Sequence, residues 1–364
     1  MNLPRTAVLL ALAATLLAPA TSGAGVRSRQ QNAGLMLVSF GESQGELVTC
    51  GCHASPKGGL ARRAAIIDSL EDQETPFLHL ELGDFAKLDA VSGDYETRFV
   101  WKMLEKTKVA AVSPGPRELT LWSTFRDLRD QRKIPVISSN VTVTTEGRTS
   151  PVGEDYRIFD VQGLRVAVFS LLGPQALADA RPPAGVVFRA ADPMQTASAL
   201  VPRLRSQADV VVLMSQMASS DTDRLLAAVP GIDVALYGLR PAWEPMARRV
   251  GATLCNETGA RGQYVGRLAL IVDPSGKIID YGSQNVPLDN HVLEDKDVAQ
   301  LVLDTQQGVA DLQAAAAKKA TTAADAPSGG SPAAAGSPAS VTPVADAPAS
   351  APPASISPGA KDGR

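Results

Sequence analysis

The sequence predicts a mixed α/β sandwich over residues 30–293. Short runs rich in branched apolar residues alternate with amphipathic helical patterns through most of this span. Two antiparallel strand pairs are also expected, one turning at Gln162-Gly163 and one at Pro274-Ser275-Gly276. Strand-helix alternation that finishes in antiparallel strands indicates mixed sheets and not a plain doubly wound fold.

The elements are predicted in order from these patterns. Helices are expected at 60–70, 96–108 and 221–231, and Pro230-Gly231 ends the third. The first carries Leu60, Ala64, Ile67 and Leu70 as an apolar stripe. Strands are expected at 34–40, 76–85, 109–115, 135–141, 157–173 (a hairpin), 208–216, 233–238, 252–257 and 264–288 (the second antiparallel pair).

Residues 1–24 have the pattern of a cleaved signal peptide. One arginine precedes an apolar run from Ala7 to Leu17, and Ala18-Pro19-Ala20 satisfies the small-residue cleavage pattern. The run is too short for a bilayer core of about 30 Å. We therefore expect an exported protein, periplasmic or extracellular, with no transmembrane segment after cleavage. A short N-terminal anchor is the alternative.

The C-terminal part divides into a helix and a tail. Residues 294–320 carry an apolar side that includes Val298, Leu301 and Val302, and we expect this helix to pack on the sandwich. Residues 321–364 are rich in Ala, Pro, Ser and Gly with almost no large apolar residue. Such a segment cannot bury enough surface to offset its ordering entropy, so a disordered tail is predicted.

Charge and cysteine content limit the class of protein. A net charge of −3 with mixed signs argues against nucleic acid or an anionic membrane as the main partner. Three cysteines allow at most one disulfide, which excludes a disulfide scaffold. We expect a monomer.

A series of landmarks resembles one known family. In order these are "GESQGEL", "GGLARRAAIIDSL", "LGDF", "VAAVSPGPREL", "IPVISSNV", "VQGLRVAVFSLLGP", "ADVVVLMSQMASSDTDRLLAAVPGIDVALYGLRP" and "ETGARGQYVGRLALIVD". The series, over about residues 34–290, is similar to the N-terminal catalytic domain of secreted 5'-nucleotidases and 2',3'-cyclic phosphodiesterases, which are calcineurin-like metallophosphoesterases. The resemblance implies a four-layer α/β/β/α sandwich, two metal ions at the strand ends and hydrolysis of phosphoesters such as nucleotides.

The family's site motifs are mostly altered in this chain. Asp-x-His-Gly is replaced by Glu42-Ser43-Gln44-Gly45, whereas the next motif is intact at Gly83-Asp84. Gly-Asn-His-Glu is replaced by Gly115-Pro116-Arg117-Glu118. Ser-His is replaced by Ser215-Gln216, and Gly-His-x-His by Gly238-Leu239-Arg240-Pro241. Every histidine of the pattern is therefore missing.

The loss of these ligands predicts a pseudoenzyme that lacks the usual di-metal centre, so that hydrolysis is lost or altered. The three histidines, His53, His79 and His291, all fall outside the family's ligand positions. A weaker oxygen-ligand site for a divalent ion such as calcium or magnesium is an alternative. Its ligands would be Glu42, Gln44, Asp84 and Gln216.

Arg117 and Arg240 stand within the motifs that carry metal-facing histidines in the family. Guanidinium groups bind phosphate or carboxylate through paired hydrogen bonds without a metal. The second hypothesis is therefore an anion-binding pocket for a nucleotide or another phosphate-bearing small molecule. The competing explanation is that both arginines form surface or ion-pair contacts.

Cys50-Gly51-Cys52-His53 follows the first motif, and Cys255 ends a later strand predicted to face the same site. Three interpretations remain open. Cys50 and Cys52 can form a small strained disulfide that is redox-active. Cys255 can form a structural disulfide with one of the pair. The three thiols and His53 can also bind zinc or copper. The alternative function is thus a noncatalytic anion-binding or thiol-based, redox-linked protein of the cell envelope.

Overall fold

The structure is a computed structural model, and it describes residues 31–50 and 55–324. The predicted signal peptide, Cys52, His53 and most of the predicted tail lie outside these residues. The predictions made for them therefore stay predictions.

The first sheet has five strands in the order β14-β13-β1-β2-β3. Strands β1, β2 and β3 are parallel to one another, whereas β13 is antiparallel to both β1 and β14. The bounds are Ala33–Phe40 for β1, Phe77–Glu81 for β2, Ala111–Val112 for β3, Tyr264–Val272 for β13 and Ile278–Pro287 for β14.

The second sheet has six strands in the order β11-β12-β10-β9-β7-β6. The inner strands β12, β10, β9 and β7 are parallel, and the edge strands β11 and β6 are antiparallel to their neighbours. The bounds are Tyr156–Val161 for β6, Leu164–Leu172 for β7, Val210–Gln216 for β9, Val234–Tyr237 for β10, Arg248–Val250 for β11 and Thr253–Glu257 for β12.

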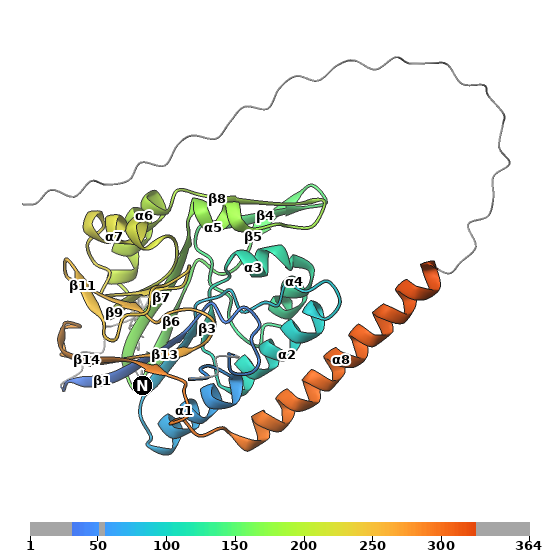
Figure 1. Cartoon of the computed structure of the whole chain (residues 1–364). Helices are drawn as coiled ribbons and strands as arrows, with labels where there is room; N and C mark the ends of the chain where they lie inside the picture. Colours follow the sequence, from blue (N-terminus) through green and yellow to red (C-terminus); the bar gives the residue numbers. More distant parts are fainter. Residues whose placement is uncertain (1–30, 51–54, 325–364) are drawn as a thin grey trace, which may run out of the picture. The chain divides into compact units, whose positions relative to one another are not determined.

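The two sheets and their helices lie in layers (Figure 1), and an apolar cluster fills the space between each pair of layers. Residues from both sheets, such as Leu37 and Val212, share one cluster between them. On the outer face of the first sheet, Ile67 of α1 (Leu60–Asp72) packs with Val38. On the outer face of the second, helices α6 (Pro193–Arg205) and α7 (Ser219–Ala228) cover a third cluster. The predicted mixed α/β fold with mixed sheets is confirmed.

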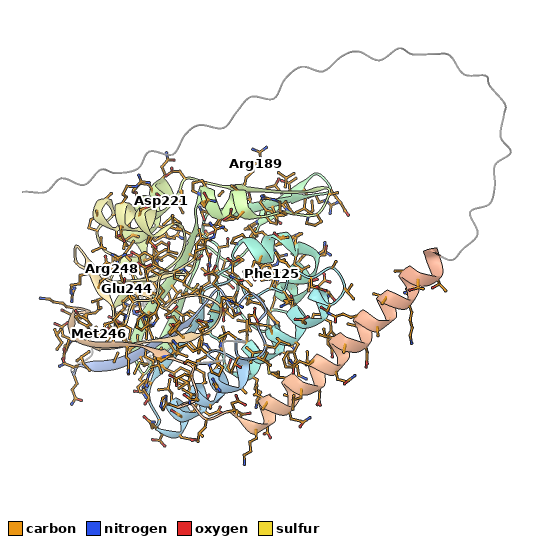
Figure 2. The ribbon with its side chains drawn as sticks, in the orientation of Figure 1. Phe125, Arg189, Asp221, Glu244, Met246 and Arg248 are labelled. Atoms are coloured by element: carbon orange, nitrogen blue, oxygen red, sulfur yellow. The ribbon has the colours of Figure 1, made fainter. Side chains whose placement is uncertain are left out.

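A fourth cluster is rich in aromatic residues and lies among α1, α2 (Gly93–Lys106) and α4 (Trp122–Asp130). Figure 2 labels Phe125 of α4 inside it. The ring of Phe125 lies 6.2 Å from that of Trp101 and 6.4 Å from that of Phe85, measured between centroids. This cluster supports the loop that leaves β2, because Phe85 follows directly after Asp84.

Both antiparallel pairs were predicted correctly. Strands β6 and β7 pair around Gln162 and Gly163, whose φ angles of 52° and 82° suit a tight hairpin turn. Strands β13 and β14 form the other pair. All four stripe residues of α1 are buried, as expected from their helical spacing.

The third strand and the segment after it differ from the prediction. Strand β3 is only Ala111–Val112; Ser113 N–H makes one more bond to Glu81 O of β2, and the N–H of Gly115 bonds instead to the Glu118 side chain. In 135–140 only isolated bridges form, at Val136 and Ile137, and Val141 begins the next strand. A small antiparallel sheet, β5-β4-β8, was not predicted, and its strands are Val141–Thr145 (β4), Arg148–Pro151 (β5) and Val186–Ala190 (β8). Helices α3 (Pro116–Thr120), α4, α5 (Pro174–Asp179) and α6 were also missed.

The C-terminal helix α8 spans Lys296–Ala324. Val298 and Val302 are buried in the aromatic-rich cluster, and Leu301 packs partly against it. The expected packing of this helix on the sandwich is therefore observed for its first turns. None of the helices in the described ranges combines the length and the apolar character needed to cross a bilayer.

Candidate functional site

The candidate site lies at the carboxyl ends of parallel strands. Loops that follow β1, β2, β3 and β10 surround a cavity of about 220 Å³. Ligands of α/β proteins commonly bind at such strand ends. The lining residues are Glu42, Gln44, Asp84, Leu88, Pro116, Arg117, Thr120, Asp179, Leu239 and Arg240. Three of the four predicted metal-site residues and both predicted arginines therefore lie around one cavity.

A larger cavity of about 560 Å³ lies between the end of α4 and β5. Its charged groups are mostly paired with each other, as in Arg129 with Asp130 and Arg157 with Glu154. We place the site in the smaller cavity because strained backbone and buried carboxyl groups converge there.

Four lining residues have left-handed backbone conformations that non-glycine residues rarely adopt. The φ angles are 50° for Glu42, 55° for Gln44, 54° for Asp84 and 45° for Arg240. Two hydrogen bonds hold the first three in place: Glu42 N–H donates to Gly83 O at 2.8 Å, and Gln44 N–H donates to Asp84 O at 2.7 Å. Strain of this kind persists where surrounding structure enforces it and is concentrated at functional sites.

Two glycines bring the loops after β2 and β3 into contact. A Cβ atom at Gly83 would lie 2.2 Å from Ser113 O, and one at Gly115 would lie 2.6 Å from Asp84 Oδ1. Gly83 also has a φ of 88°. Neither position can hold a side chain without moving the backbone that carries Asp84.

Glu118 holds the same loops together through hydrogen bonds, and sequence reasoning did not assign it a role. Its fully buried carboxylate accepts hydrogen bonds from the N–H groups of Asp84, Ala86 and Gly115, each at 2.8 Å. The available signal was its position three residues after Gly115, the spacing of a helix capping box. Its role is to position Asp84.

Burial raises the pKa values of all three carboxyl groups. The pKa of Glu42 rises to about 7, through loss of solvent and then the negative charge of Asp84. The pKa of Asp84 rises to about 6, mainly by burial, although the Arg117 N–H and guanidinium oppose the shift. Burial and Asp84 raise the pKa of Glu118 to about 8 against its three N–H donors. Near neutral pH this site can therefore gain or lose protons.

The two arginines are held differently. Arg117 donates from Nε to Ala86 O at 2.8 Å and from Nη2 to Gln44 O at 3.3 Å, so its guanidinium is anchored against the loop after β2. Arg240 is more exposed and pairs with Asp179 at 2.7 Å. The positive charges of both arginines lower the pKa of Glu42.

Gln216, the fourth predicted metal-site residue, is buried at the end of β9 and does not line the cavity. A Cβ atom at Gly83 would lie 2.9 Å from its Nε2, and one at Gly238 would lie 2.6 Å from it. Neither Oε1 nor Nε2 has a hydrogen-bond partner among the described residues. The amide is therefore enclosed next to Gly83 and Gly238, and the residues that follow these two glycines line the cavity.

The side chains present do not fit a two-metal phosphoesterase centre. His79 bonds to Thr107 O and Arg63 inside the protein, and exposed His291 bonds to Asp289. Within residues 31–50 and 55–324, no group of three or more His, Cys, Asp and Glu side chains is arranged to hold a metal ion. The cavity has carboxyl and amide oxygens but no imidazole, whereas zinc sites rely on nitrogen or sulfur ligands.

The two described cysteines occupy different surroundings. Cys50 is buried, and its sulfur accepts a hydrogen bond from Lys57 N–H at 3.3 Å. Cys255 lies in the cluster under α6 and α7, and burial raises the pKa of its thiol. It does not line the cavity. Because Cys52 and His53 are outside the described residues, the pairing and metal hypotheses remain predictions.

Comparison with solved structures identifies the class of fold. The chain matches a 5'-nucleotidase precursor from Thermus thermophilus with a TM-score of 0.66 and 21% identity, over 77% of this chain and 60% of that one. It matches the Thermus thermophilus sulfate thiohydrolase SoxB, solved with glycerol, with a TM-score of 0.66 and 19% identity, over 76% of this chain and 61% of that one.

A third match covers nearly all of its target. The calcineurin-like phosphoesterase YfkN from Bacillus subtilis aligns with a TM-score of 0.61 and 17% identity, over 78% of this chain and 98% of that one. The chain therefore has the fold of calcineurin-like phosphoesterases and of the corresponding part of 5'-nucleotidases, and it spans about 60% of the first two proteins. No family model and no curated protein matches the sequence.

Proposed function

We propose that this protein binds an anionic small molecule of the phosphate-bearing class in the cavity of a phosphoesterase fold, and that ordinary two-metal hydrolysis is lost or altered. The observation that carries the proposal is the placement of Arg117 and Arg240 around the same cavity as Glu42 and Asp84. Arg117 has a guanidinium group where phosphoesterases of the resembling family have a histidine, and Arg240 lies between the two histidine positions of its motif.

The anchoring of Arg117 supports anion binding. Its hydrogen bonds to Ala86 O and Gln44 O use two of the five N–H donors of a guanidinium. Because these bonds fix the plane of the group, less rotamer entropy is lost when the remaining donors bind an anion. A cavity of about 220 Å³ suits a small anion or one end of a larger ligand.

The raised pKa values also favour an anion. Protonation of Glu42 and Asp84 removes negative charge from the cavity while both arginines stay positive. The pocket therefore becomes more attractive to an anion as these carboxyl groups become neutral.

Thermal unfolding in the presence of inorganic phosphate, sulfate or adenosine monophosphate tests the proposal. We expect at least one of these anions to raise the melting temperature, and the effect to be lost in Arg117→Ala. If none of the three anions changes the melting temperature, the result counts against an anion pocket. Assays with a generic aryl phosphate, with and without added zinc or manganese, test the loss of hydrolysis.

A hard divalent cation is a second candidate ligand. Glu42 Oε2 and Gln216 Oε1 are buried oxygens without a partner among the described residues, and calcium or magnesium prefers such oxygen ligands. Titration with calcium or magnesium, in the wild type and in Glu42→Gln, separates this candidate from the anion pocket.

We further propose that the chain is exported, as residues 1–24 predict, and that Cys50 and Cys52 are the basis of any redox-linked role.

A further inference from the structure

The side chains between the two sheets change from apolar to polar along the strands. On β1 the inward side chains are Leu35, Leu37 and then Ser39, and on β12 they are Leu254 and then Asn256. Since strand side chains alternate between faces, each polar residue occupies the next inward position after the apolar ones. The inter-sheet core is therefore apolar at one end and polar at the end near the cavity.

The polar side chains converge on a bare glycine. In the first sheet, Gly266 of β13 lies opposite Ser39 of β1 and Asn285 of β14. A Cβ atom at Gly266 would lie 2.3 Å from Ser39 Oγ, 2.3 Å from Thr258 Cγ2 and 2.6 Å from Asn256 Nδ2. Side chains of both sheets thus meet around Gly266. We call this group, Ser39, Asn256, Thr258, Gly266 and Asn285, the Gly266 cluster.

Most polar atoms of the Gly266 cluster have no partner among the described residues. They are Ser39 Oγ, Thr258 Oγ1, Asn285 Oδ1 and both amide atoms of Asn256. All four side chains are at most 3% exposed. A buried polar group without a hydrogen bond is destabilising, so five such atoms in one place call for a partner.

The orientation of Asn285 is fixed by its own hydrogen bonds. Its Nδ2 donates to Glu244 O at 2.6 Å and to Glu257 O at 2.8 Å. Glu244, labelled in Figure 2, precedes β11, so this amide ties β14 to the second sheet. Because both N–H groups are engaged with carbonyls, the Oδ1 atom is an acceptor that needs a donor.

We propose that ordered water molecules bind in the Gly266 cluster and join the two sheets there. The cluster contains acceptors, hydroxyl groups and the Asn256 amide donor, and it contains no charged side chain. Water both donates and accepts, whereas a cation cannot satisfy the Asn256 N–H groups. Buried waters typically make about three hydrogen bonds to polar groups of this kind.

The hydration continues towards the cavity. Register pairs Tyr237 of β10 with Ser215 of β9 and with Glu257 of β12. Gly238 and Thr258 come directly after the ends of β10 and β12, and Gln216 is the last residue of β9. Gln216 has an unpartnered amide, and Gly238 contributes no side chain. We therefore extend the proposed hydration from Thr258 of the Gly266 cluster to the amide of Gln216. The inference is independent of which ligand the cavity binds.

Two measurements on the full chain test this inference. A crystal structure at about 1.5 Å resolution should show water bridging Asn285 Oδ1 to at least one other member of the cluster. In addition, Thr258→Val removes the hydroxyl at nearly constant volume and should lower the melting temperature. The matched control is Thr222→Val, because buried Thr222 bonds to Ser215 Oγ at 2.7 Å and to Ala218 O at 3.2 Å.

The opposite outcomes are equally definite. A melting temperature of Thr258→Val equal to or above that of the wild type, with Thr222→Val lowered, would mean that the Thr258 hydroxyl has no partner and would overturn the proposal. Direct hydrogen bonds between the cluster side chains without water would overturn it as well. A cation bound at coordination distance from the cluster side chains would also overturn the proposal. Soaking crystals in rubidium and measuring the anomalous signal at the site detects such a cation.

Discussion

The main-chain N–H of Arg117 donates a 2.8 Å hydrogen bond to Oδ1 of Asp84. This bond joins the intact Gly-Asp motif to the altered Gly-Pro-Arg-Glu motif. The carboxylate that would bridge two metals in the resembling family is therefore held by the backbone beside a guanidinium. Asp84 and Arg117 are therefore the central pair of the proposed anion site.

Replacing Arg117 should weaken anion binding more than replacing Arg240. Arg117 is anchored by two carbonyl oxygens, whereas Arg240 is exposed and already paired with Asp179. A charge-assisted hydrogen bond contributes about 1.5–3 kcal/mol, so Arg117→Ala should reduce affinity by about tenfold or more. Calorimetric titration with sulfate measures this. Arg132→Ala, in the other cavity, is the control, and equal losses in all three variants would contradict the site.

Anion binding should strengthen as the pH falls from 8 to 5. The pKa values of Glu42 and Asp84 are raised to about 7 and about 6, so each carboxyl becomes neutral within this window. Each protonation removes one negative charge from the cavity. Sulfate is the suitable probe because it stays doubly charged over this range. An affinity that is flat across the range, or that falls, would show that these carboxyl groups do not face the bound anion.

Glu118→Gln should destabilise the fold and impair anion binding together. The glutamine has one carbonyl oxygen for three N–H donors, and its NH2 group would face at least one of them. We expect a loss of about 2–4 kcal/mol in the free energy of unfolding, measured by urea denaturation. Glu105→Gln is the control because Glu105 forms a surface pair with Lys133 and should cost less than about 1 kcal/mol. Similar stabilities for both variants would refute the bracing role.

The protein should carry no stoichiometric zinc or iron when purified without chelators. The described part of the cavity has no histidine, and zinc and iron sites of this kind depend on nitrogen or sulfur ligands. Elemental analysis tests this expectation. One equivalent of such a metal that is lost in Asp84→Asn would restore the two-metal hypothesis, whereas a metal unaffected by that variant would point to the cysteine loop.

Features set by near neighbours in the chain were predictable. The turn at Gln162-Gly163 depends on Gly163, which readily adopts positive φ, and the helix from Leu60 depends on apolar residues three and four apart. The candidate site was partly predictable, since Glu42, Asp84, Arg117 and Arg240 follow recognisable motifs at strand ends. Their meeting around one cavity agrees with that order of motifs.

The surroundings of Glu118, Cys255 and Gln216 could not be predicted from the sequence. Glu118 was passed over because its three partners are set by the packing of two loops. Cys255 was expected near the site, but strand alternation and the position of β12 put it under α6 and α7. Gln216 ends the expected strand, yet neighbouring glycines on other strands decide that its amide is enclosed behind the cavity.

By itself, the sequence determined most strands of the two larger sheets, the two hairpins and the replacement of every histidine in the family motifs. These depend on local periodicity and on residue identity, which the chain carries directly. Only the tertiary structure decided that Arg117 is anchored while Arg240 is exposed, that burial raises the carboxyl pKa values, and that polar side chains of both sheets meet at Gly266. Burial and electrostatic fields arise from residues distant in the chain, so they exist only once the sheets have packed.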